Sequence, residues 1–127
     1  MKTIITSENA PKALGPYSIA VKSAGFLFCS GQLGLSPLTG ELVEGGVEQQ
    51  ARQALENIRF VLQSAGCGME DIVKTTIFLT DMKDFPSVNA VYGAYFSGDY
   101  PARSTIAVAA LPKGGLIEIE VIAAAKG

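Results

Sequence analysis

The 127-residue sequence contains no histidine and no tryptophan. Without histidine the chain cannot supply a Ser-His or Cys-His catalytic pair or a histidine-ligated metal site, and we predict no metal site. Histidine is also the side chain whose ordinary pKa lies closest to 7. An acid–base catalyst in this chain must therefore be a carboxylate, lysine, cysteine or tyrosine whose pKa the fold has shifted.

Charge is scarce as well, because charged residues make up only 17 % of the chain where about 25 % is usual. The net charge is −2, and no basic run indicates a nucleic-acid interface. No apolar run approaches the ~18 residues of a membrane span, and Met1–Gly15 lacks the apolar core of a signal peptide. We therefore expect a cytoplasmic protein without a membrane or nucleic-acid partner.

The two cysteines, Cys29 and Cys67, form neither a CxxC pair nor a disulfide framework. With no histidine or visible cation to lower their pKa, we expect reduced, unreactive thiols.

Apolar residues are abundant, at 48 % of the chain with a mean hydropathy of +0.30. The length fits one domain over residues 1–127, which is large enough to bury a core without disulfides or metals. The small amount of polar residues suggests that apolar surface is buried between subunits.

Hydrophobic periodicity predicts two helices and six strands. One helix covers residues 47–65, and another starts at Asp84 or Phe85 and ends at Gly98. The strands are Lys2–Ile5, Ser18–Lys22, Phe26–Ser30, Val73–Thr80, Ser104–Ala109 and Leu116–Ala123. Gly31–Gly46 is predicted as a long loop, and Gly114-Gly115 as a hairpin turn between the last two strands.

This order of elements predicts an α+β fold in which both helices pack on one face of a single sheet. The other face of the sheet would be bare. Its low charge content leads us to expect that other subunits, rather than water, cover it.

Arg103 opens a predicted strand and follows Tyr100-Pro101-Ala102. An arginine in this position could bind a carboxylate or phosphate with its planar fork. The alternative is a surface salt bridge, which the residues alone favour because arginines are mostly exposed.

Glu118 and Glu120 alternate with Ile117 and Ile119, so both carboxylates lie on one sheet face. They could form an acid–base site in which one pKa is raised, or they could mark a solvated face. Tyr17 and Ser30 could orient a ligand or serve as ordinary hydrogen-bonding residues. For Asn89, beside the apolar stripe of the second helix, a local cap or bridge is favoured.

Several short segments carry a resemblance that adds to this interpretation. They are Gly15-Pro-Tyr17-Ser18, Phe28-Cys-Ser30-Gly31-Gln32, Gln53-Ala-Leu55-Glu-Asn57-Ile58, Val88-Asn89-Ala90-Val-Tyr92, Pro101-Ala-Arg103-Ser104, Leu111-Pro-Lys113 and Ile117-Glu118-Ile119-Glu120. In this order they resemble the reactive intermediate deaminase A (RidA) family, also called the endoribonuclease L-PSP group. The resemblance runs from about Gly15 to Ala123.

The resemblance implies a chorismate-mutase-like α+β fold and a homotrimer with three clefts between subunits. It implies hydrolysis of 2-enamine and 2-imine acids, such as 2-iminobutanoate and 2-iminopropanoate, to 2-oxo acids and ammonia, without a cofactor or metal.

Carried over by position, the resemblance gives each site residue a role. Arg103 would hold the substrate carboxylate, and Glu118 would orient the water. Tyr17, Ser30 and Gly31 would line the cleft, with Asn89 beside them. Thr105 stands where many members have cysteine, which leaves open whether that position contributes its side chain or only its backbone N–H.

Two other functions stay open from the sequence. One is a non-catalytic protein that binds 2-oxo acids through the same arginine. The other is a ribonuclease or translation inhibitor, against which the lack of a basic stripe argues.

Overall fold

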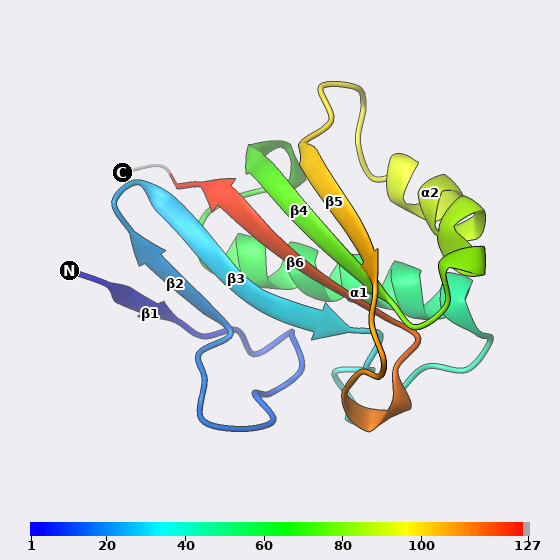
Figure 1. Ribbon diagram of the computed structural model, residues 1–127. Helices are drawn as coiled ribbons and strands as arrows, with labels where there is room; N and C mark the ends of the chain where they lie inside the picture. Colours follow the sequence, from blue (N-terminus) through cyan, green and yellow to red (C-terminus); the bar gives the residue numbers. More distant parts are fainter. Residues whose placement is uncertain (126–127) are drawn as a thin grey trace.

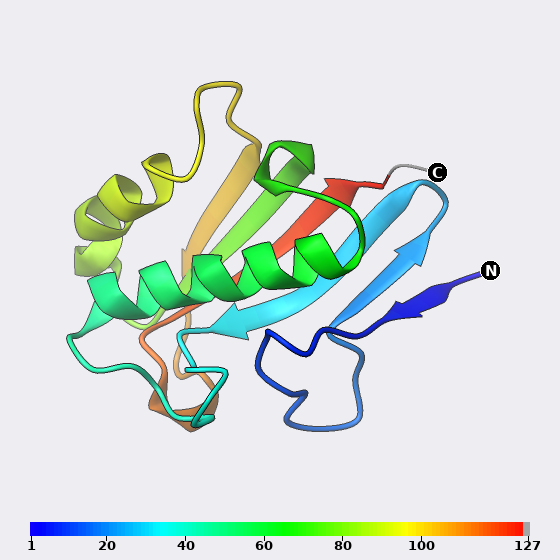
Figure 2. The same ribbon diagram turned by 180° about the vertical axis from the view of Figure 1, so that it is seen from behind.

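In the computed structural model, which describes residues 1–125, a six-stranded sheet carries two helices on one face (Figures 1 and 2). The strands are β1 (Thr3–Ile5), β2 (Ala20–Ser23), β3 (Phe26–Leu33), β4 (Ile72–Leu79), β5 (Ala102–Ala107) and β6 (Ile117–Ala124). The helices are α1 (Val47–Ser64) and α2 (Phe85–Gly93). This arrangement confirms the predicted α+β fold.

The strands are ordered β1-β2-β3-β6-β4-β5 across the sheet. The β4–β5 pair is parallel, and the other neighbouring strands are antiparallel. The last strand in the chain, β6, therefore lies in the middle of the sheet, where both of its neighbours fix the position of its side chains.

The core forms between the sheet and α1. On β6, Ile117 and Ile119 are fully buried while Glu118 between them faces the opposite side. The predicted helix over residues 47–65 is confirmed to within one residue, and it buries an apolar stripe of Ala51, Ala54, Leu55, Ile58, Val61 and Leu62. Full burial of one such large aliphatic side chain contributes about 1.5–3 kcal/mol, so this layer holds the sheet to the helix.

Two predicted boundaries differ from the structure by three residues or more, and the others lie within two residues. The third strand does not end at Ser30, because a register shift between Cys29 and Gln32 lets β3 continue pairing with β6 as far as Leu33. The second helix ends at Gly93 rather than Gly98. Its last turn tightens, with the N–H of Tyr95 bonded to the carbonyl of Tyr92 three residues back.

The prediction of a hairpin at Gly114-Gly115 is also wrong. Strand β4 lies between β5 and β6, so residues 108–116 cross over β4 instead of turning back on β5. A short 3-10 turn, Pro112–Gly114, lies in this crossover and places Pro112 near the start of β6.

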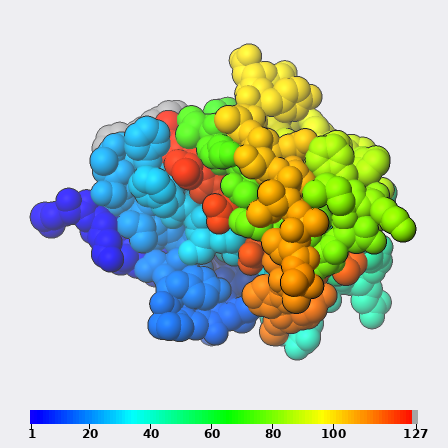
Figure 3. All heavy atoms as spheres, in the orientation of Figure 1, coloured from blue at the N-terminus to red at the C-terminus, as the bar shows by residue number. Residues whose placement is uncertain are grey.

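The face of the sheet opposite the helices is bare within one chain (Figure 1). It exposes large apolar side chains that include Ile4, Phe26, Phe28 and Ile106, each by more than two-fifths of its surface. Figure 3 shows this face hollowed where the N-terminal loop in blue, β6 in red and the orange crossover segment meet. Among the described helices, none has the length and apolar content needed to cross a membrane.

Candidate functional site

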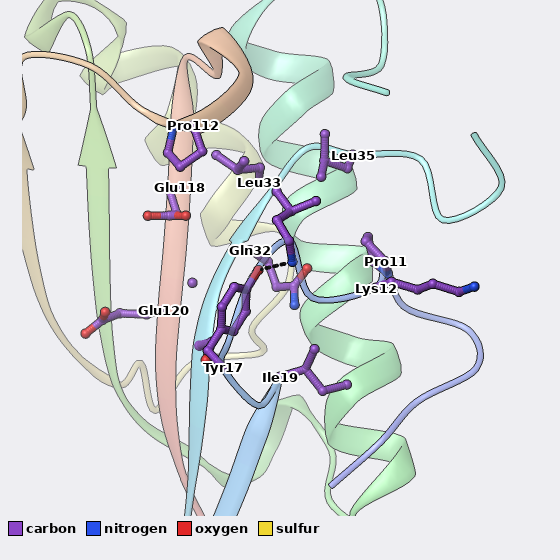
Figure 4. Close-up of a pocket in the computed structure, with 13 residues that line it drawn as sticks. Pro11, Lys12, Tyr17, Ile19, Gln32, Leu33, Leu35, Pro112, Glu118 and Glu120 are labelled. Atoms are coloured by element: carbon purple, nitrogen blue, oxygen red, sulfur yellow. Dashed lines mark hydrogen bonds between the residues drawn. The ribbon is translucent and has the colours of Figure 1, made fainter. Parts of the chain in front are cut away.

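A cavity of about 560 Å³ opens at this hollow (Figure 4). Its walls come from the loop before β2, the end of β3, the crossover turn and β6. The lining residues are Pro11, Lys12, Leu14, Tyr17, Ile19, Ser30, Gly31, Gln32, Leu33, Leu35, Pro112, Glu118 and Glu120. Five residues named from the sequence, Tyr17, Ser30, Gly31, Glu118 and Glu120, therefore line one cavity.

Gly31 and Glu118 lie against each other across the β3–β6 pair. A Cβ atom placed on Gly31 would lie 2.7 Å from Cδ of Glu118 and 2.9 Å from its Cγ. No other residue type leaves this space, because carbon atoms in contact ordinarily lie about 3.5–4.0 Å apart. Glycine at position 31 thus lets the Glu118 carboxylate lie directly on the strand backbone.

The environment of Glu118 favours its protonated form. Burial of the half-buried side chain raises the pKa of this carboxyl, and the negative charge of Glu120 raises it further. Glu120 itself is exposed at the mouth of the cavity. A half-buried carboxyl with a raised pKa in a cavity is suited to proton transfer.

Tyr17 and Ser30 are held by local hydrogen bonds. The Tyr17 hydroxyl accepts a bond of 3.0 Å from the backbone N–H of Leu14, which fixes the loop over the cavity (Figure 4). Ser30 donates its hydroxyl to the carbonyl of Ser18 over 2.6 Å. These bonds show that both residues have the ordinary hydrogen-bonding role considered from the sequence, and each oxygen keeps a lone pair for a further donor.

Buried polar side chains of α1 fix the cavity walls from behind. Asn57 is fully buried, and its Nδ2 donates to the carbonyls of Leu33 at 3.1 Å and Leu35 at 2.9 Å. Gln50 accepts a bond of 2.9 Å from the backbone N–H of Leu116, two residues before Glu118. The helix therefore sets the positions of both strand ends that carry the cavity residues.

Arg103 lies elsewhere, on β5 facing α2. Its guanidinium carbon is 4.9 Å from the ring centre of Tyr92 and 5.5 Å from that of Phe85. Among residues 1–125 it forms no ion pair, so the expected surface salt bridge is wrong. Two aromatic faces hold the guanidinium by cation–π contact and leave its hydrogen-bonding fork available for an anion.

Two unsatisfied polar atoms lie on the elements that flank Arg103. Thr105 follows on the same side of β5, and its buried Oγ1 has no hydrogen-bond partner within the described chain. Asn89 lies on α2, and its buried Oδ1 is likewise unpartnered there, so the expected local cap is wrong. Buried polar atoms are rarely left without a partner, so both oxygens can accept a donor from outside the described chain.

The sequence-named residues thus form two groups on opposite faces of the sheet. Glu118 pairs with Phe78 on the open face, while Arg103 pairs with Thr75, whose hydroxyl bonds to Tyr92 of α2 at 2.8 Å. Within one chain, Arg103 does not line the cavity that contains Glu118.

Sequence reasoning missed Gln32 as a cavity residue. The segment containing it was recognised, but the predicted strand ended before it, and no pattern in the sequence indicated that this residue lies at a cavity.

The remaining nucleophiles are as expected from the sequence. Cys29 and Cys67 are free and buried, and burial raises the pKa of the Cys29 thiol to about 12. Within residues 1–125, no three acidic or sulfur side chains are grouped so that they could hold a metal ion.

Comparison with known proteins identifies the family. The sequence model described as Endoribonuclease L-PSP matches residues 7–125. The chain is 49 % identical over 123 residues to mouse 2-iminobutanoate/2-iminopropanoate deaminase, covering 97 % of this chain and 91 % of the mouse protein.

Solved structures agree in fold. A Rid family protein from Yersinia pestis superposes with a TM-score of 0.95 at 52 % identity, covering 98 % of this chain and 99 % of the other. E. coli TdcF with bound serine superposes with a TM-score of 0.93 at 42 % identity, with coverage of 98 % and 99 %. The resemblance carried by the short segments is confirmed, and the chain belongs to the Rid family, the group that the Endoribonuclease L-PSP model describes.

Proposed function

We propose that the protein hydrolyses 2-imino and 2-enamino acids to 2-oxo acids and ammonia. The observation that carries the proposal is the half-buried Glu118 carboxyl with a raised pKa, held against Gly31 in a cavity. The relatives named 2-iminobutanoate/2-iminopropanoate deaminase, at about half identity over nearly the whole chain, support the same chemistry.

The active unit in this proposal is a homotrimer. Arg103 and Glu118 lie on opposite faces of one sheet, so one substrate reaches both only if they come from different copies. The exposed Phe26, Phe28 and Ile106 supply apolar surface for such an assembly. The bare open face would be covered, as the composition led us to expect.

Arg103 binds the substrate carboxylate in this arrangement. A planar fork makes two parallel charge-assisted hydrogen bonds to a carboxylate, which fixes the orientation of the neighbouring carbon. Asn89 and Thr105, with their unpartnered oxygens, would complete the surroundings of the bound acid.

Glu118 acts on the water and then on the leaving nitrogen. It accepts one proton as the water oxygen bonds to the carbon of the protonated imine, and the C=N bond becomes a C–N bond in a carbinolamine. It gives that proton to the nitrogen, and the C–N bond breaks to release ammonia. The Glu118 carboxylate then takes the proton of the hydroxyl as the carbonyl of the 2-oxo acid forms. General acid–base transfer of this kind typically contributes about 10²–10⁴-fold.

An imine is already an electrophile, so orientation and one placed proton acceptor suffice without a metal or an activated nucleophile. Alignment of bound reactants contributes up to ~7–11 kcal/mol in favourable intramolecular cases. The ribonuclease alternative is less favoured, because the chain has a net charge of −2 and no basic run to make the phosphate contacts that dominate nucleic-acid affinity.

The test is an ammonia-release assay in which a threonine dehydratase generates 2-iminobutanoate in the presence of the purified protein. Semicarbazide, which traps the imine, reports its lifetime independently. We expect faster ammonia release and less trapped imine than in buffer. Tight 2-oxobutanoate binding without acceleration would instead support the non-catalytic 2-oxo-acid-binding alternative and contradict the catalytic proposal.

A further inference from the structure

Tyr92 is the nearer of two aromatic side chains of α2 that contact Arg103 on the edge strand β5 (Figures 1 and 2). The guanidinium carbon lies 4.9 Å from the Tyr92 ring centre and 5.5 Å from that of Phe85. Both distances are within the ~6 Å over which a ring face attracts a cation. The two aromatic residues are seven positions apart, so they lie on one face of α2. This face of the helix is therefore the surface against which the Arg103 side chain rests.

The Tyr92 ring is itself held in place by its surroundings. Only 4 % of the residue is exposed, and its hydroxyl shares a hydrogen bond of 2.8 Å with the hydroxyl of Thr75 on β4. The Phe96 ring packs against it, with 4.9 Å between the ring centres. Thr75 is also the residue that pairs with Arg103 across the parallel β4–β5 strands. Burial and these contacts therefore fix the ring relative to the strand that carries the arginine.

The two rings are what restricts the Arg103 side chain within the described chain. Its guanidinium forms neither an ion pair nor a hydrogen bond with any of residues 1–125. A long side chain that is free to change rotamer must be ordered when a ligand binds, and that ordering lowers affinity. Contact with a fixed ring orders the guanidinium before the ligand arrives. It also leaves the N–H groups in the guanidinium plane able to donate to a carboxylate.

We propose that Tyr92 is a positioning residue that acts through Arg103, because its ring face holds the guanidinium in the orientation that receives the substrate carboxylate. The inference rests on the proposed function for the role of Arg103 as the carboxylate-binding group. It gives Tyr92 no contact with the substrate itself. Loss of the ring should therefore weaken the binding of 2-oxo acids with different side chains by a similar factor, since only their shared carboxylate is affected.

The test removes the ring and measures binding of pyruvate and 2-oxobutanoate to the assembled protein by calorimetry. Tyr92→Leu should weaken the binding of both acids by about three- to tenfold, the cost of ordering one long side chain on binding. The double variant Tyr92→Phe with Thr75→Val keeps the ring and removes both hydroxyls together, so that no buried hydroxyl is left unpaired. Because the ring stays packed in place, this variant should bind both acids with close to wild-type affinity.

Motion of the Arg103 side chain gives a readout that a loss of stability alone would not change. Nitrogen NMR relaxation of its Nε–H group reports the order of the side chain on the ps–ns timescale. This order should fall in Tyr92→Leu and stay at the wild-type value in the double variant. Tyr95→Leu is the matched control, because it also removes a ring and a hydroxyl bond of 2.8 Å, here to Glu56, without touching Arg103. It should leave both the affinity and the order of Arg103 unchanged.

If Tyr92→Leu fails to fold, as judged by circular dichroism, Tyr92→Met fills more of the same space and carries the same expectation. Wild-type affinity in the variant without the ring would overturn the inference, and so would equal weakening in the double variant or in Tyr95→Leu. Absence of binding in the wild type would contradict the Arg103 clamp and this inference with it. Because binding of stable 2-oxo acids needs no turnover, a ring-dependent affinity without imine hydrolysis would support the inference and contradict the catalytic proposal alone.

Discussion

Gly31→Ala perturbs the position of Glu118 without removing any functional group. The added methyl carbon would lie 2.7 Å from Cδ of Glu118, whereas carbon atoms in contact lie about 3.5–4.0 Å apart. Gly31 is not in the left-handed region, so alanine adds no backbone strain. The carboxylate must therefore move by roughly 1 Å, and displacement of that size can cost about 10²-fold in rate.

The assay is the initial rate of ammonia release from imine generated in the presence of the variant, together with a thermal melt. We expect a loss of rate of about two orders of magnitude with a nearly unchanged melting temperature, because Glu118 is half-buried and has room to move. Gly93→Ala is the matched control, since a Cβ at that position meets nothing within 4 Å. A folded Gly31→Ala variant with the wild-type rate would refute the role given to Glu118.

Other substitutions test the remaining parts of the account. Arg103→Ala should weaken 2-oxobutanoate binding by at least about tenfold, since a charge-assisted hydrogen bond is worth ~1.5–3 kcal/mol. Arg103→Lys should also bind poorly, because an ammonium lacks the planar fork of the guanidinium. An affinity for 2-oxobutanoate that calorimetry finds unchanged in the alanine variant would exclude the carboxylate clamp. Glu118→Gln should slow hydrolysis by about 10²-fold or more while binding persists. The same variant should melt at a higher temperature than wild type at pH 8, because a raised pKa means that ionisation of Glu118 opposes folding. This gain should vanish at pH 4, where the carboxyl is protonated in the folded state, and equal gains at both pH values would contradict the raised pKa. Asn57→Leu should lower the free energy of unfolding in urea by at least about 2 kcal/mol, because two buried carbonyls lose their donor. The exposed Gln63→Leu is the control, and a smaller loss of stability in Asn57→Leu than in this control would count against the stabilising role of Asn57.

Local sequence patterns predicted most of the fold. The period of buried residues in α1 and the alternation of Ile117, Glu118 and Ile119 in β6 follow directly from helix and strand geometry. These patterns depend only on neighbours in the chain, so one sequence suffices to find them.

The order of strands in the sheet could not be predicted from local sequence patterns. Nothing local to residues 108–116 indicates that β6 inserts between β3 and β4, because that choice is made by long-range packing. The strand bulge after Cys29 was missed for a similar reason, since pairing with β6 overrides the tendency of Gly31 to end a strand.

The candidate site was predicted in part. The family segments named Glu118, Gly31, Tyr17 and Ser30, and the structure brings these four together in one cavity. The sequence could not show that Arg103 lies on the opposite face of the sheet from Glu118. Which side chains of β5 face α2 is set by tertiary packing, here by the contact of Arg103 with Tyr92.

The central claim is that one active site takes Arg103 and Glu118 from different copies of the chain. Subunit complementation tests this claim most directly. The Arg103→Ala and Glu118→Gln variants are co-expressed in the same cells and purified as mixed assemblies. Each variant alone should be nearly inactive in the ammonia-release assay. In a random one-to-one mixture, about a quarter of the clefts between subunits receive both intact residues.

The account therefore predicts that the mixed assemblies recover about a quarter of the wild-type rate, since each restored cleft combines one intact residue from each variant. The two variants purified separately and combined without subunit exchange serve as the control and should stay inactive. Mixed assemblies that contain both variants yet remain as inactive as either parent would contradict a shared site.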